Sequence, residues 1–225
     1  MKAVVLLSGG ADSVTCLAVA IYQHGKENVS ALSVSYGQKH IKEIESARKV
    51  AEYYGIPLYT VDLSKTYEFS NCSLLQHSTE AIEHKSYAEQ KHLATYVPFR
   101  NGLMLSAAGA LALSIYPNEL VALYYGAHAD DTLGGAYPDC TPEFVDAMSK
   151  ALFEGSGHLL HVEAPFVNVN KAGVIARGTL LKVPYELTWS CYEGGDKHCG
   201  KCGTCIDRKK AFEEAGVVDP TEYEE

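Results

Sequence analysis

Four of the seven cysteines crowd near the C-terminal end of the sequence, at a spacing that suits a metal ion. Thiolates that close together favour tetrahedral zinc, and four protein sulfurs leave no open position on the ion for a catalytic water. We therefore predict a structural zinc motif over residues 189–207, with a redox pair or an iron–sulfur cluster as the alternatives. His198 lies next to a ligand and is expected to be a bystander. The predicted ligands are Cys191, Cys199, Cys202 and Cys205.

A second group of residues, near the N-terminus, is suited to binding phosphate. Two glycines let the backbone turn tightly and bring N–H groups to an anion, and a helix that starts near Ser13 adds its positive end. Asp12 is expected to bind the metal that accompanies a nucleotide, or to orient the loop. Neither the lysine-containing P-loop pattern nor the dinucleotide fingerprint is present, and a plain glycine-rich turn is the alternative. The loop consists of Ser8, Gly9, Gly10, Ala11, Asp12 and Ser13.

Further charged candidates lie in the middle of the chain. Arg100 opens an apolar helix, and its guanidinium can bind a phosphate or carboxylate through two parallel hydrogen bonds; a surface salt bridge is the alternative. Asp130 and Asp131 follow the carboxyl end of a predicted strand, where they could reach magnesium or the ring nitrogens of a guanine-like base. A solvated turn is the alternative for Asp131.

Aromatic and acidic residues after this strand could hold a flat ring. Tyr137 and Phe144 offer stacking surfaces, and Asp139 offers a hydrogen-bond acceptor. Asp139 could equally cap the helix that begins at Pro142. Cys140 is expected to be a neutral thiol, because no base lies beside it in the sequence.

The elements that must position these residues follow a βαβ rhythm. Such an order implies right-handed crossovers and an α/β fold, namely a doubly wound parallel sheet covered by helices. Residues 64–96 break the pattern and are expected to form an excursion near the substrate mouth. We expect strands over residues 2–7, 29–36, 58–62, 120–125 and 161–164, and helices from about Ser13 to Gly25 and over residues 39–54, 103–115, 142–153 and 171–181.

Composition limits the class of protein. A chain of 225 residues, 47% of them hydrophobic, fits one catalytic domain over residues 1–225. No stretch approaches the roughly 20 apolar residues of a membrane span, and the first residues meet Gly, Asp and Ser too early for a secretory signal. A net charge of −9 disfavours a nucleic-acid partner and favours a small-molecule substrate. The total of seven cysteines is odd and four of them are clustered, which indicates reduced thiols and a metal site and not a set of disulfides. We therefore expect a cytoplasmic protein.

The loop at residues 8–13 resembles the pyrophosphatase loop of the adenylating ATP-pyrophosphatase, or PP-loop, superfamily. This resemblance implies an adenine nucleotide alpha hydrolase-like fold and cleavage of ATP, as a substrate, to AMP and pyrophosphate. It leaves the second substrate open.

The loop, the four cysteines and two further stretches, residues 97–101 and 126–144, together resemble the 7-cyano-7-deazaguanine synthase family over nearly the whole chain. The resemblance implies Mg²⁺, a homodimer, and conversion of 7-carboxy-7-deazaguanine and ammonia to a nitrile through an adenylated acid and an adenylated amide. Arg100 and Asp130 would act in catalysis and substrate binding, and Lys171, ahead of Arg177, in neutralising the leaving pyrophosphate. The implied substrate contacts are Arg100, Asn101, Asp130, Tyr137, Asp139 and Phe144.

Two residues depart from the family pattern, and two other functions stay open. Phe99 stands where glycine is expected, and Thr141 where arginine is expected. A tRNA-thiolating relative would share the loop but needs a basic RNA surface, and a non-enzymatic zinc-bearing nucleotide sensor would bind without turnover. We expect free ammonia and not glutamine as the nitrogen source, because the βαβ core and the cysteine motif leave no room for a glutaminase site.

Overall fold

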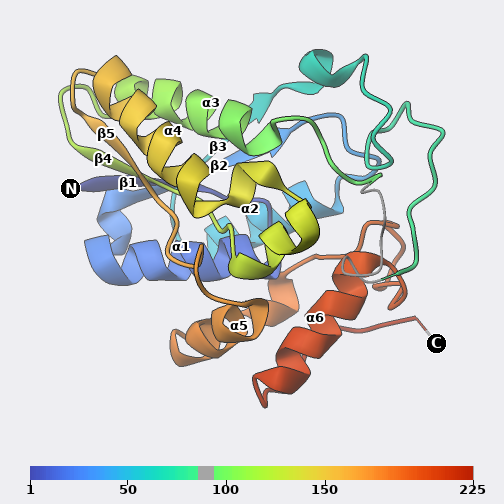
Figure 1. Cartoon of the computed structure of the whole chain (residues 1–225). Coiled ribbons are helices and arrows are strands. Elements are labelled where there is room, and N and C mark those ends of the chain that lie inside the picture. The colour runs from blue at the N-terminus through green and yellow to red at the C-terminus, as the bar shows by residue number, and fades with distance from the viewer. Residues whose placement is uncertain (86–93, 225) are drawn as a thin grey trace.

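A parallel five-stranded sheet forms the centre of the molecule (Figure 1). This computed structural model describes residues 1–85 and 94–224. The strand order is β3-β2-β1-β4-β5, so the winding direction reverses between β1 and β4, where doubly wound sheets place their ligands. The predicted fold class is confirmed. The strands are β1 (Lys2–Leu6), β2 (Val29–Ser35), β3 (Leu58–Asp62), β4 (Val121–Tyr124) and β5 (Leu160–Glu163).

Helices cover both faces of this sheet (Figure 1). Successive strand residues point to opposite faces, so Ala3 and Val5 pack with α1, α2, α5 and α6, whereas Val4 and Leu6 pack with α3 and α4. Cys16 lies on the buried side of α1. The helices are α1 (Ala11–His24), α2 (Lys42–Tyr54), α3 (Arg100–Ile115), α4 (Pro142–Gly155), α5 (Lys171–Leu180) and α6 (Gly203–Glu214).

The start of α3 differs from the prediction in a way that matters for the site. The helix begins at Arg100, three residues before the predicted start at residue 103, so Arg100 and Asn101 belong to its first turn. Apolar periodicity does not reveal this turn, because its cap comes from a distant part of the chain. The Asp139 carboxylate accepts a hydrogen bond from the Asn101 backbone N–H at 2.9 Å.

Helix α6 was not predicted, because its buried face is not apolar. Arg208 lies in the middle of this face with 0% of its surface exposed. Its guanidinium makes a bidentate ion pair with Asp219 (3.0 Å) and donates to the Thr188 hydroxyl at 2.7 Å. Because Arg208 is charged but buried, the apolar residues of α6 do not recur at helical spacing, and hydropathy alone does not predict the helix.

The predicted excursion after β3 is confirmed for the described part of residues 64–96. A 3₁₀ turn over Ser64–Tyr67 is its one regular element there. Its buried apolar side chains, Leu75 among them, form a small separate cluster beneath Tyr36. Tyr96 at its end lines the main cavity of the molecule. Residues 86–93 of the predicted excursion lie outside the described residues.

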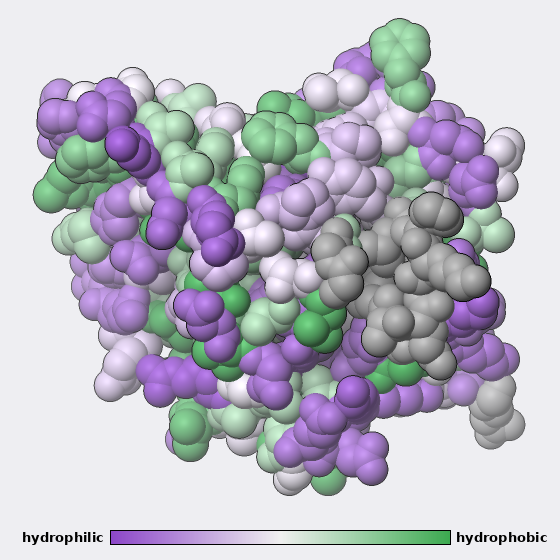
Figure 2. Space-filling view, in the orientation of Figure 1, coloured by the Kyte–Doolittle hydropathy of each residue, from purple (hydrophilic) through white to green (hydrophobic). Residues whose placement is uncertain are grey.

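The surface is mixed in polarity. On the face shown in Figure 2, hydrophobic side chains lie scattered among hydrophilic ones. None of the helices built from residues 1–85 and 94–224 is long and apolar enough to cross a membrane.

Candidate functional site

The loop at residues 8–13 joins the carboxyl end of β1 to α1 and is held from two sides. Gly9 adopts φ +89°, and a Cβ there would lie 2.4 Å from the backbone oxygen of Glu43. Only glycine fits both the backbone conformation and the space. The Gly9 carbonyl accepts hydrogen bonds from the Ser46 hydroxyl (3.0 Å) and from the Trp189 backbone N–H (2.9 Å). Helix α2 and the segment that leads into the cysteine motif thus fix the shape of the loop.

The loop has the donors that an anion needs. The Ser8 and Ser13 hydroxyls lie 3.0 Å apart, and Ser13 also donates to the Gly10 carbonyl at 3.0 Å. The first N–H groups of α1 have no partner within the helix and carry the positive end of its dipole. Their position at the carboxyl edge of the sheet matches the predicted phosphate site.

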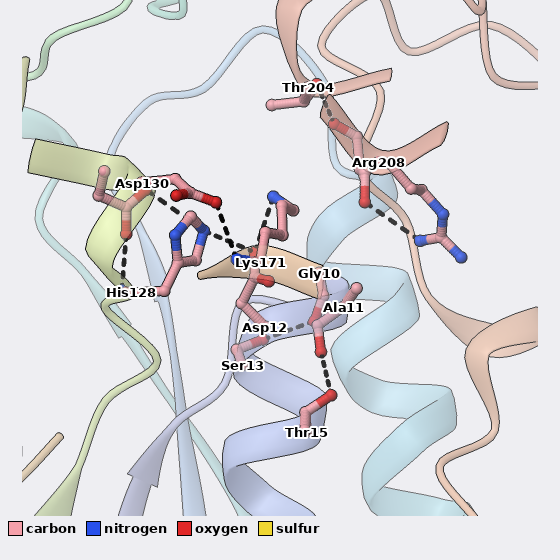
Figure 3. A network of polar contacts seen from close by, with 12 residues as sticks. Gly10, Ala11, Asp12, Ser13, Thr15, His128, Asp130, Lys171, Thr204 and Arg208 are labelled. Atoms are coloured by element: carbon pink, nitrogen blue, oxygen red, sulfur yellow. Dashed lines mark hydrogen bonds and ion pairs between the residues drawn. The ribbon is translucent and has the colours of Figure 1, made fainter. Parts of the chain in front are cut away.

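Asp12 makes an ionic cluster with Lys171 and His128 (Figure 3). The Lys171 ammonium lies 3.1 Å from Asp12 Oδ2, and His128 Nε2 lies 3.7 Å from the same oxygen. Burial favours the neutral acid, but Lys171 and His128 outweigh it and hold the pKa of Asp12 well below its usual range. Asp12 Oδ1 is buried and has no hydrogen-bond partner among the described residues. This ionised carboxylate with one free oxygen suits a divalent cation.

The two neighbouring aspartates have different positions, which corrects the emphasis on Asp130. Asp130 Oδ2 accepts a hydrogen bond from the Lys171 backbone N–H at 2.8 Å, so it stabilises the start of α5 (Figure 3). Asp131 lines the cavity, and its carboxylate accepts from the His128 backbone N–H at 3.0 Å. Gly126 lets this loop pass close to α1, since a Cβ there would lie 3.0 Å from the backbone of Asp12. Asp131 is therefore the better placed of the pair to meet a bound cation.

Arg100 lines the same cavity. Its guanidinium donates to the Tyr36 hydroxyl at 3.4 Å and lies 5.2 Å from the centre of the Tyr36 ring. Burial alone would lower the pKa of Arg100, but Tyr36 and other neighbours raise it, so the side chain stays charged. No carboxylate of the described residues forms an ion pair with it. The surface salt bridge considered for Arg100 is absent there, and the cation is free to meet an anionic substrate group.

Asp139 has one carboxylate oxygen engaged and one free. Oδ2 caps α3 through the Asn101 backbone N–H, whereas Oδ1 is buried without a partner among the described residues. The Asn101 side chain donates to the Asp139 carbonyl at 3.3 Å and to Cys140 Sγ at 3.2 Å. Burial raises the pKa of Cys140 far above its usual value, so this thiol is neutral at physiological pH. A free acceptor beside the Tyr137 ring suits the N–H groups of a flat base.

Phe144 and Thr141 lie outside this cavity lining. The Phe144 ring packs edge-on against Phe99 with centroids 6.0 Å apart, so the geometry gives no support to its predicted stacking role. The Thr141 hydroxyl accepts from the Phe144 backbone N–H at 3.1 Å and caps α4, which is the role considered for Asp139. Phe99 has a φ of +52°. This left-handed conformation costs a side-chain-bearing residue about 1–2 kcal/mol and explains why the family pattern expects glycine there.

The loop and Asp131 share one cavity with Arg100, Asn101, Lys171, Tyr137 and Asp139. Its floor is the carboxyl edge of the sheet, where the lining includes the apolar Leu6, Leu32 and Val34. Sequence reasoning missed Tyr36 and Glu43, which also line it. It also missed His128, although a histidine two residues before a pair of aspartates was a usable signal. No comparable signal marks Glu43, because a glutamate in the first turn of a helix is common.

The four predicted metal ligands come together. The Sγ atoms of Cys191, Cys199, Cys202 and Cys205 lie within 4.8 Å of one another, and all four residues are buried. Backbone N–H groups of Glu193 and Cys199 point at Cys191 Sγ (3.4 and 3.3 Å). Such donors stabilise thiolates, and this closed sulfur set suits a tetrahedral ion.

His198 is not part of this sulfur cluster, but it orders the surrounding chain. Its Nε2 accepts from the Ser190 backbone N–H at 3.0 Å, and its ring lies 4.3 Å from that of Trp189. The Ser190 carbonyl accepts from the Thr204 hydroxyl at 2.6 Å. Trp189, Ser190 and Thr204 also line the cavity. The cysteine motif therefore supplies one wall of the cavity.

Comparison with known proteins points to one family. The sequence profile of the family described as "Queuosine biosynthesis protein QueC" matches residues 2–216. A 7-cyano-7-deazaguanine synthase from Caldicellulosiruptor bescii is 45% identical over 224 residues, which cover 100% of this chain and 98% of the relative. The synthase from Archaeoglobus fulgidus is 44% identical over 221 residues, covering 98% of this chain and 89% of the relative.

A solved structure shares the fold at low sequence identity. It is that of an NMN synthetase from Francisella tularensis, with a TM-score of 0.53 and 16% identity. The likeness covers 96% of this chain and 78% of that one.

Proposed function

The chain belongs to the queuosine biosynthesis protein QueC family, and from this premise we propose that it converts 7-carboxy-7-deazaguanine and ammonia to 7-cyano-7-deazaguanine with ATP as co-substrate. One observation carries the proposal. A single cavity joins a phosphate-binding loop, with its Asp12–Lys171 pair, to a free cation at Arg100 and a free acceptor at Asp139. The arrangement can hold a nucleotide's phosphates and an acidic, guanine-like base side by side.

The first half of the reaction is adenylation of the acid. Its carboxylate oxygen attacks the α-phosphate, the bond to the β-phosphate oxygen breaks, and pyrophosphate leaves with that electron pair. The N–H groups at the start of α1 and the Lys171 ammonium neutralise charge on the leaving group. Arg100 orients the carboxylate, and Asp139 Oδ1 with the Tyr137 ring orients the base.

The second half converts the acyl adenylate to the nitrile. Ammonia displaces AMP to give the amide, whose oxygen is adenylated by a second ATP. Loss of both N–H protons and departure of AMP with the C–O electron pair leaves the C≡N bond. The same loop and cations serve both adenylations, which explains how one cavity suffices.

Two metals complete the proposal. Asp12 and Asp131 are the residues that would hold Mg²⁺, because Asp12 Oδ1 has no other described partner, and the ion would supply charge neutralisation at the pyrophosphate. A structural zinc ion would be held by the four cysteine sulfurs, whose closed arrangement leaves no place for a catalytic water.

The state of the cysteines bears on the cellular compartment of the reaction. We place the reaction in the cytoplasm, since all seven cysteines are free thiols in the structure and such thiols persist in a reducing compartment. We also propose that its partners are small molecules and not nucleic acid, because the net charge is −9. The homodimer stays a prediction from the family resemblance, as does a single domain over residues 1–225.

Acid-dependent pyrophosphate release tests the proposal. Protein with Mg²⁺ and ATP is assayed with and without 7-carboxy-7-deazaguanine, in wild type, in Asp139→Asn and in a control, Asp146→Asn, whose side chain is exposed on α4. We expect release only with the acid, an increase in KM of at least about tenfold in Asp139→Asn, and wild-type kinetics in the control. Release that does not depend on the acid would reject the substrate, and no release at all would favour a nucleotide sensor.

A further inference from the structure

One carboxyl group in the cavity makes no hydrogen bond or ion pair with the described residues. Glu43 lies in the first turn of α2 and lines the cavity. Its side chain forms no hydrogen bond and no ion pair with any of residues 1–85 and 94–224. Its backbone oxygen abuts Gly9 of the phosphate loop, while its side chain interacts electrostatically with Arg100. Glu43 therefore stands between the group that holds phosphate and the cation that would hold the substrate carboxylate.

Each of the other acids of the cavity has at least one carboxylate oxygen engaged. Asp12 is paired with Lys171, and Asp131 accepts from the His128 backbone. Asp139 holds the start of α3 through one oxygen, and its other oxygen lies in the predicted base site. Among the described residues, Glu43 is thus the carboxyl of the lining that is free to exchange a proton.

Two groups interact electrostatically with Glu43: Arg100, from the first turn of α3, and Tyr36, which follows β2. Burial raises the pKa of Glu43 to about 7, against the opposing effect of Arg100. Burial raises the pKa of Tyr36 far above its usual value, so this hydroxyl stays neutral. Glu43 can then take up and release a proton near neutral pH.

The proposed reaction needs a proton acceptor at this place. Ammonia is almost wholly protonated at neutral pH, and the ammonium ion has no lone pair with which to attack an acyl carbon. Resting on the proposed function, we propose that Glu43 is the ammonium site: it binds the ion by charge and accepts its proton beside the acyl adenylate. A partly buried carboxylate in a cavity whose lining includes tyrosine rings is suited to an ammonium-sized cation.

Amide formation begins with a proton transfer. Ammonium gives one proton to the Glu43 carboxylate, and the lone pair of the resulting ammonia forms the C–N bond. The bond between the acyl carbon and the AMP oxygen breaks, and its electron pair leaves with AMP. The excess proton on the new nitrogen goes to the AMP phosphate, and Glu43 returns its own proton to water.

Two nucleophiles separate this role from a structural one. Hydroxylamine is largely unprotonated at neutral pH, so it captures the acyl adenylate without a base. We compare ammonium-dependent amide formation and hydroxamate formation in wild type, in Glu43→Gln and in Glu45→Gln. The last is a matched control from the same turn of α2, outside the cavity lining.

In Glu43→Gln we expect amide formation at pH 7 to fall about 100-fold and hydroxamate formation by less than about threefold. Amide formation in this variant should go on rising with pH as free ammonia increases, whereas the wild-type rate should level off near the pKa of Glu43. Equal losses with both nucleophiles, or wild-type amide formation in Glu43→Gln, would overturn the assignment. Wild-type protein that makes neither product from the acid would instead reject the proposed function.

Discussion

Asp12 and Lys171 are far apart in the sequence but form an ion pair at the loop of residues 8–13. The first prediction therefore concerns the removal of the Asp12 charge. Asp12→Asn keeps the volume of the side chain and removes the negative charge 3.1 Å from the Lys171 ammonium. We expect pyrophosphate release to fall at least about 100-fold, because the Mg²⁺ that would neutralise the leaving group loses a carboxylate ligand. Stopped assays of pyrophosphate measure the rate, and circular dichroism checks the fold. An unchanged rate would contradict the role of Asp12.

The second prediction compares substitutions at the adjacent Asp130 and Asp131, and the Asp130 variant serves as the control for the Asp131 variant. Asp131 lines the cavity, whereas Asp130 holds the backbone N–H of Lys171 at the start of α5. Asp131→Asn should lower kcat more than tenfold and raise the Mg²⁺ requirement, because a cation ligand is weakened. Asp130→Asn should cost about 1 kcal/mol of stability and leave the Mg²⁺ requirement near that of wild type. A Mg²⁺ titration of both variants measures this, and the reverse order of effects would restore Asp130 as the ligand.

Residue types and spacing predicted the loop and the cysteines because those signals are local. Gly9 and Asp12 stand within one short segment, and so do the four cysteines. The roles of Asp130 and Asp139 were harder to assign, since each caps a helix that is remote in sequence. Which of two adjacent aspartates faces the cavity depends on backbone geometry that spacing does not reveal.

At the scale of elements, the cysteine motif supports the phosphate loop through Trp189, whose backbone N–H donates to the Gly9 carbonyl at 2.9 Å. We therefore predict one zinc ion per chain, and its loss in Cys202→Ser together with a lower thermal stability and weaker ATP binding. Metal analysis of protein purified without added zinc, with calorimetry for ATP, measures both. Cys72→Ser, which changes a cysteine remote from the motif, is the control. Equal zinc in Cys202→Ser and wild type would reject these ligands.

Helix α6 carries the fourth prediction. Arg208 is fully buried and joins α6 to Asp219 and to Thr188. Removing one member of a buried ion pair leaves the other uncompensated, so Arg208→Ala should lower the free energy of unfolding by about 3–5 kcal/mol.

Urea denaturation measures the stability of Arg208→Ala. Lys210→Ala, which deletes an exposed cation of the same helix, should change the free energy of unfolding by less than about 1 kcal/mol. Similar losses in the two variants would show that the buried ion pair does not hold α6.

The elements that sequence periodicity predicted are those whose buried residues carry no charge. The five strands and five of the helices meet this condition, and their observed bounds lie within a few residues of the predicted ones. Helix α6 fails it because Arg208 occupies its buried face, and the first turn of α3 fails it because Asp139 caps it from another part of the chain.

At the scale of the whole molecule, the reversal of strand order between β1 and β4 brings the phosphate loop beside the loop that holds Asp131. The cysteine motif and the first turns of α2 and α3 then enclose the cavity. A parallel sheet predicts this meeting point from topology alone.

The nitrogen source also depends on the whole molecule, because a glutaminase would need a second nucleophile and a second oxyanion hole elsewhere in the chain. Of the three cysteines outside the motif, Cys16 and Cys140 have pKa values raised far above the usual range, chiefly by burial.

The measurement that tests the central claim most directly resolves the products of the complete reaction by mass. Purified protein is given Mg²⁺, ATP and 7-carboxy-7-deazaguanine, with either ammonium or glutamine as the nitrogen source. We expect 7-cyano-7-deazaguanine from ammonium, with two AMP formed for each nitrile, and no nitrile from glutamine alone. Nitrile from glutamine at ammonium-like rates would reveal a hidden amidotransferase, and the absence of nitrile under both conditions would contradict the proposed function itself.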